Sequence, residues 1–187
     1  MHEQLRKIGY ELRGALDRAQ QLVATTLVGD WGQRPEEGSW SVGECFAHLN
    51  MTSEATLPHI RSAMDRLEPR RGNAPGRYRR DVLGWIIWRS QAEGMRIRTK
   101  TSPAFVPGGA ATPTAALERF EDLQRELLEL VNRADGLPLT AVKIQSAFNA
   151  KVRYNVFSAL SILSVHHHRH LGQAERAAAA VVERKGG

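Results

Sequence analysis

Apolar side chains recur every three or four residues over most of this sequence, and this spacing constrains the fold more than any other feature. In residues 3–28 the apolar positions are Leu5, Ile8, Leu12, Leu16, Ala19 and Val23. Such spacing lines one face of a helix. Similar patterns run through 41–67, 112–135 and 155–184, and a shorter, very apolar segment covers 81–95. No segment alternates convincingly as a half-buried strand would. The sequence predicts four long helices, one short helix and no sheet.

The ends of the predicted helices carry recognisable signals. Ser41 and Glu44 fit a capping box, in which each side chain bonds the other residue's backbone NH. Thr112 followed by Pro113 is typical of an N-cap and a first helical position. Pro58 lacks a backbone NH, so we expect it to kink or interrupt the second helix. Residues 139–154 fit neither pattern clearly.

Helices of this length and patterning predict an all-α protein, an antiparallel four-helix bundle with one additional short helix and long connecting loops. Residues 1–187 suit a single domain, and 42% hydrophobic residues are enough for a core. No apolar run approaches the roughly 18 residues of a membrane helix. The N-terminus lacks the apolar segment of a secretory signal. The single cysteine, Cys45, forms no internal disulfide. We therefore expect a cytoplasmic protein that does not enter membranes.

The chain carries a net charge of +6, and its basic residues are unevenly distributed. One segment rich in glycine and proline holds Arg70, Arg71, Arg77, Arg79 and Arg80. A basic segment of this kind is more typical of a solvated loop than of a nucleic-acid site, and no zinc-finger or RRM signature accompanies it. We expect no specific nucleic-acid binding, and a small molecule as the partner. A homodimer is compatible with the sequence.

A histidine cluster near the C-terminus is the sharpest chemical feature. His166 and His170 are four residues apart, so they share a helical face and can bind one ion. His168 lies about 200° around the helix from His166 and should face away. His167 could instead pair with His170, an arrangement that ranks second. A third ligand should come from another helix, and His48 is the best-placed histidine. From the pattern alone, a metal site is no better supported than its alternative, in which the histidine cluster is solvated and His48 is a hydrogen-bonded core residue.

Three segments resemble one family of metalloenzymes. Residues 40–49, WSVGECFAHL, are similar to the W-S-x-x-E-x-x-x-H-L entry to the second helix of the DinB-like (YfiT-like) family. Residues 166–173, HHHRHLGQ, resemble that family's H-x-x-R-H-L-x-Q, and the loop with Pro103, Phe105 and Pro107 resembles its middle region. The order and the spacing of more than a hundred residues make the combination more specific than any one motif.

The resemblance implies a four-helix bundle whose three-histidine site is His48, His166 and His170. The family includes bacterial thiol-dependent transferases and a mycothiol-dependent maleylpyruvate isomerase. It thus implies a divalent metal ion, zinc or nickel before others, and a low-molecular-weight thiol as co-substrate. The sequence departs from the family pattern in His167, His168 and the arginine-rich segment. These departures bear on the substrate rather than on the three histidines.

Three imidazoles on one ion leave a coordination position for a water or a thiolate. We therefore expect a metal-dependent enzyme of the thiol-transferase or hydrolase type. The alternatives are a non-catalytic ligand- or nucleic-acid-binding bundle with a structural metal, and a dimer whose metal only joins helices. Glu44 lies one turn before His48, where the capping box is its first role and orienting His48 or the bound water its second. Cys45 is expected to pack in the core.

Overall fold

The computed structural model describes residues 1–68, 76–91 and 101–187. Its elements, in chain order, are α1 (Glu3–Thr25), α2 (Val42–Met64), α3 (Val82–Gln91), the 3-10 helix η1 (Pro103–Phe105), α4 (Pro113–Arg133), β1 (Lys143–Gln145), β2 (Arg153–Asn155) and α5 (Val156–Gly186). Four helices are long and one is short. The all-α class predicted from the apolar spacing is confirmed.

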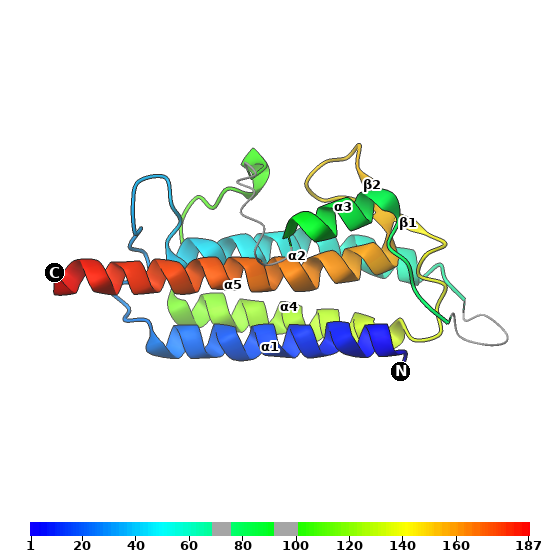
Figure 1. Ribbon diagram of the computed structural model, residues 1–187, viewed down its shortest axis with the longest axis horizontal. Coiled ribbons are helices and arrows are strands. Elements are labelled where there is room, and N and C mark those ends of the chain that lie inside the picture. The colour runs from blue at the N-terminus through cyan, green and yellow to red at the C-terminus, as the bar shows by residue number, and fades with distance from the viewer. Residues whose placement is uncertain (69–75, 92–100) are drawn as a thin grey trace.

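The four long helices lie side by side as a bundle (Figure 1). Around the bundle, α1 contacts α4 and α5, and α2 contacts the same two helices. The pairs α1–α4 and α2–α5 are antiparallel, whereas α2 and α4 run in the same direction (Figure 1). The long connection that carries α3 and η1 brings the chain back to the end where α2 began. The α3 helix packs on α5 outside the bundle.

The helix starts have the caps that the sequence predicts. Ser41 Oγ accepts a hydrogen bond from the Glu44 backbone NH at 3.1 Å, and Glu44 Oε2 accepts one from the Ser41 NH at 2.9 Å. Thr112 caps α4, with Pro113 as its first residue. These bonds satisfy NH groups that the first helical turn leaves unpaired. The start of α2 at Val42, six residues before His48, is thereby fixed.

Two details differ from expectation. The predicted interruption of the second helix at Pro58 is wrong, because α2 continues through this residue. Pro58 and Glu54, whose carbonyl loses its bond, are both exposed, so water can satisfy that carbonyl. The predicted absence of strands is also wrong. Ile144 pairs with Tyr154 in a two-stranded antiparallel sheet, and strands of three residues are too short for periodicity to reveal.

The arginine-rich segment is only partly described, since Arg70 and Arg71 lie outside the described residues. Arg77 and Arg79 are exposed, as a solvated loop predicts. Arg80 instead stacks its guanidinium over Trp88 at 4.0 Å from the ring centroid. That contact attaches this arginine to α3 rather than presenting it to a partner.

The core consists of two apolar clusters separated by a polar layer. One cluster fills the end of the bundle beside the hairpin, and the other fills the end where α2 and α4 begin. Between them lie buried polar side chains from three helices: Asn50, Thr52, Ser53, Thr56, Gln124, His166, His167 and His170. No helix in the described residues is long and apolar enough to cross a bilayer. Buried polar side chains need hydrogen-bond partners within the protein, so the contacts among these residues identify the candidate functional site.

Candidate metal centre

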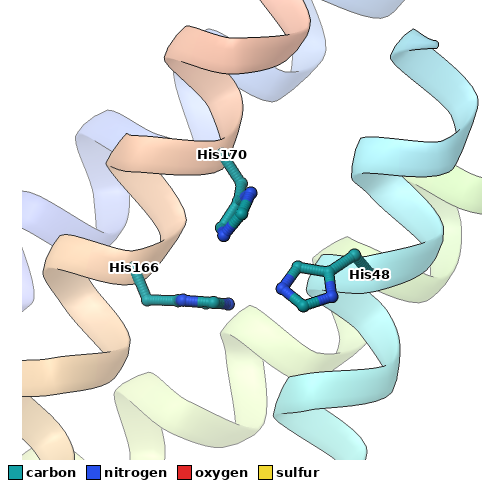
Figure 2. Close-up of side chains that lie close together, drawn as sticks. All are labelled: His48, His166 and His170. Carbon is teal, nitrogen blue, oxygen red and sulfur yellow. The ribbon is translucent and has the colours of Figure 1, made fainter. Parts of the chain in front are cut away.

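The structure brings His48 on α2 together with His166 and His170 on α5. Their candidate ligand atoms all lie within 4.8 Å of one another. The three side chains are 2%, 6% and 9% exposed, respectively. One ring nitrogen of each points toward the space between the rings (Figure 2). The i, i+4 spacing on α5 produces this convergence, because it places His166 and His170 one turn apart on the face toward α2.

Hydrogen bonds at the outer nitrogens orient two of the rings. His48 Nδ1 lies 2.8 Å from the Phe105 carbonyl oxygen, which can only accept, so Nδ1 carries the proton. His170 Nδ1 lies 3.1 Å from Gln173 Oε1 and donates in the same way. The Nε2 atoms of both rings are then unprotonated and face the centre. This arrangement, with the second nitrogen bonded to an oxygen, is typical of metal-binding histidines.

Thr52 borders the third ring. Its Oγ1 lies 3.3 Å from His166 Nε2 and donates to the Leu49 carbonyl oxygen at 3.0 Å. Thr52 follows His48 by four residues, so both side chains lie on the same face of α2. The sequence reasoning did not single out Thr52, although this spacing is the signal that would have found it. It also missed Phe105 as the partner of His48, which joins the site through backbone that no side-chain pattern reveals.

Burial keeps the three imidazoles neutral. It lowers the pKa of His48, and it lowers that of His166 well below the ordinary value, with further lowering from the nearby His170 and His48 rings. The pKa of His170 falls to about 3, chiefly through burial and then through His48. A neutral imidazole is the form that binds a metal ion. At neutral pH, protons therefore do not compete for these three nitrogens.

The remaining histidines of the cluster have other partners. His168 faces away from the site, as predicted, and lies against α1, where Nε2 is 2.8 Å from the Glu11 carbonyl oxygen and Nδ1 is 2.8 Å from Arg18 Nη1. His167 is buried, with Nε2 at 3.1 Å from Ser53 Oγ and Nδ1 at 2.8 Å from Gln124 Nε2. The alternative pairing of His167 with His170 is therefore wrong, since both nitrogens of His167 are engaged elsewhere.

Glu44 and Cys45, also considered from the sequence, are not among the candidate metal ligands of the described residues. The Glu44 carboxylate accepts from Ser41 and forms an ion pair with Arg34. Its capping role is confirmed, and its side-chain bonds go to those two residues. Cys45 is fully buried in the apolar cluster, and burial raises the pKa of its thiol to about 12. The thiol is thus held in its protonated, unreactive form.

A cavity of about 380 Å³ adjoins the site through Trp40 and Gln173, which contact the His48 and His170 rings. Trp40 and Gln173 form part of its wall, and Arg176 and Glu36 supply opposite charges. The Trp40 ring centroid is 4.8 Å from that of His48 and 5.9 Å from that of His170. The sequence analysis included Trp40 only as the first residue of the motif that resembles the family's entry to the second helix. In the structure it is the aromatic wall between the histidines and this cavity.

Comparison with known proteins bears on the family of this chain. No curated protein matches the sequence, and no solved structure does. A family model described as the DinB superfamily matches residues 11–174, a span that includes all three histidines and both motifs. The chain belongs to the DinB superfamily.

Proposed function

We propose that this protein is a metal-dependent enzyme of the thiol-transferase or hydrolase type, with a divalent ion on His48, His166 and His170. The observation that carries the proposal is the convergence of three buried, neutral imidazoles from two helices. Each supplies a nitrogen lone pair, and this donor set suits zinc or nickel. When bound, such an ion acts as a Lewis acid that lowers the pKa of a water to about 7 or holds a thiolate.

The number of ligands favours a catalytic site over a structural one. Structural zinc sites are closed by four protein ligands, whereas catalytic sites use three and keep one position open. Within residues 1–68, 76–91 and 101–187, the candidate group contains three ligand side chains. This count supports an open position, and hence an enzyme rather than a bundle with a metal that only joins helices.

The chain's own residues supply orientation and a place for the substrate. The Phe105 carbonyl and the Gln173 side chain hold the His48 and His170 rings, so that Nε2 of each faces inward. Trp40 limits the space beside the rings, and the adjoining cavity offers the guanidinium of Arg176 and the carboxylate of Glu36. A small molecule with polar or charged groups fits such a lining. A low-molecular-weight thiol is our proposed co-substrate.

Cobalt substitution tests this proposal. Protein prepared without a histidine tag is loaded with Co²⁺, and its visible spectrum is recorded before and after addition of a small thiol. We expect a tetrahedral spectrum, with a sulfur-to-cobalt charge-transfer band when the thiol binds. The same titration of His170→Ala should give neither signal. A spectrum that is unchanged by thiol, azide and cyanide would contradict an open position and assign the metal a structural role.

A further inference from the structure

A second cavity, of about 250 Å³, lies between the C-terminal half of α2 and the hairpin. In Figure 1 this is the end of the bundle where the β1–β2 hairpin lies and β1 contacts α2, away from the C-terminus of α5. His59 of α2 lines the cavity and is eleven residues after His48. By the rise of a helix that separation is roughly 16 Å, so the cavity is distinct from the metal centre.

Helix and strand periodicity together build the lining. His59 and Ser62 are three residues apart and form one stripe on the exposed face of α2, and Arg66 lies in the turn that follows this helix. In the hairpin, Ile144 and its partner Tyr154 face the core. Lys143, Gln145 and Arg153, which flank these two residues along the strands, are exposed and face outward. The cavity lies where the helical stripe meets the outer face of the hairpin.

The lining is strongly basic and its charge is only partly neutralised. None of the described residues that line it is acidic. Lys143 forms an ion pair with Asp81 at 3.4 Å, outside the lining. Arg66 and Arg153 form no ion pair with any residue that the structure describes, whereas four exposed arginines of the bundle helices, Arg61, Arg119, Arg125 and Arg133, each have an acidic partner. Two guanidinium groups thus face one small cavity without a counter-charge.

We propose that this cavity binds the phosphate group of a small phosphorylated molecule, with Arg66 and Arg153 as its principal ligands. Guanidinium groups donate paired hydrogen bonds to phosphate oxygens, and Lys143 adds a third cation at the rim. The Ser62 hydroxyl and the Gln145 amide add neutral donors. A concave site of this volume holds a phosphate with a small attached group, whereas a nucleic-acid backbone needs an extended surface.

The test is calorimetric titration with pyrophosphate at low and at moderate salt. Wild-type protein should bind one pyrophosphate per chain, and the double variant R66Q/R153Q should bind about tenfold or more weakly, because two charge-assisted contacts are lost. The matched control is R6Q/R13Q, which removes the same charge from exposed positions on α1, away from α2. Ser62→Glu adds a carboxylate to the lining while leaving both arginines, and should weaken binding similarly.

Repeating each titration in His170→Ala separates this site from the proposed enzyme site, since pyrophosphate could also bind a metal ion. His170→Ala should still bind pyrophosphate, whether or not this variant retains a metal ion. Absence of binding by wild-type protein, or equal weakening by R66Q/R153Q and R6Q/R13Q, would overturn the proposal. So would a short DNA duplex that binds more tightly than pyrophosphate and depends on the same two arginines, because the surface would then be a nucleic-acid interface.

Discussion

Removal of one imidazole from the proposed metal centre should abolish most of the metal binding. His170→Ala deletes a ring whose centroid lies 4.5 Å from those of both His48 and His166. Two histidines then remain where three converged. We expect the metal content of tag-free protein to fall from about one ion per chain to a small fraction of that value. His48→Ala and His166→Ala should have the same effect, because the three rings contribute equivalent lone pairs.

The stability change follows from linkage. An ion that binds only the folded chain stabilises it by about 2.7 kcal/mol at a free concentration one hundred times Kd. For a chain of this length each kcal/mol moves Tm by roughly 2–4 °C, so a chelator should lower the Tm of wild-type protein by about 5–11 °C. The same chelator should barely move the Tm of His170→Ala, which has little bound metal to lose.

Two neighbouring histidines serve as controls. His168→Ala removes bonds to Glu11 and Arg18, and His167→Ala removes bonds to Ser53 and Gln124. Each change should cost about 1–3 kcal/mol of folding free energy and leave the metal content intact. Elemental analysis is therefore the deciding measurement and calorimetry its complement. Equal metal loss in all the alanine variants, or a chelator shift in His170→Ala as large as in wild type, would refute the reasoning.

Three further predictions concern Cys45, Glu44 and Gly84. Cys45 should resist thiol reagents in the native protein at pH 8 and react only on unfolding, because burial raises its pKa to about 12; rapid native labelling would contradict its burial. Burial favours a raised pKa for Glu44, but the hydrogen bonds from Arg34 and Ser41 outweigh burial and lower the pKa below 4.5. The stability that Glu44 contributes is therefore full above pH 4.5 and is lost as the pH falls through the lower pKa of the folded protein. Urea unfolding should show Glu44→Gln less stable than wild type by about 1 kcal/mol at pH 7, with the difference disappearing in acid. Gly84→Ala should lower stability by about 1–2 kcal/mol despite better helix propensity, because its Cβ would overlap the buried Ser158; an increased Tm would show that α3 can shift.

The bundle was predictable because long helices carry a long signal. The apolar spacing over six turns identified α1, and the caps at Ser41 and Thr112 located the starts of α2 and α4. The failures have physical reasons. A hairpin of two three-residue strands gives too few residues for alternation to stand out. The apolar sequence of α3 does not reveal how exposed this helix is: Trp85 is 52% exposed, since one face of this short helix packs on α5 and the rest points outward.

Side-chain spacing predicted more of the candidate site than of the connecting loops. The i, i+4 relation identified His166 and His170 without any knowledge of the fold. The position of His48 on another apolar-faced helix and the motif resemblance both pointed to it as the third ligand, but neither could show the contact, because nothing in a sequence fixes how two helices meet. The Phe105 carbonyl lies 57 residues from His48, and a backbone oxygen leaves no trace in residue types. To predict that Trp40 forms a wall beside the histidines, the position of its loop would have to be known as well as the composition of that loop.

The number of hydrogen-bonded nitrogens on each ring separates the structural histidines from the candidate ligands better than burial does. His167 is only 1% exposed, less than His48, yet both of its nitrogens are engaged and no lone pair remains for an ion. His168 is likewise bonded at both nitrogens. Within the described residues, His48 and His170 are each bonded at Nδ1 alone. For His166 the neighbouring Thr52 hydroxyl already donates to a carbonyl, so it does not consume the lone pair. A cation is the partner that the inward, unprotonated nitrogens of His48 and His170 can share with the neutral His166 ring, because neither nitrogen carries a proton to donate to the other.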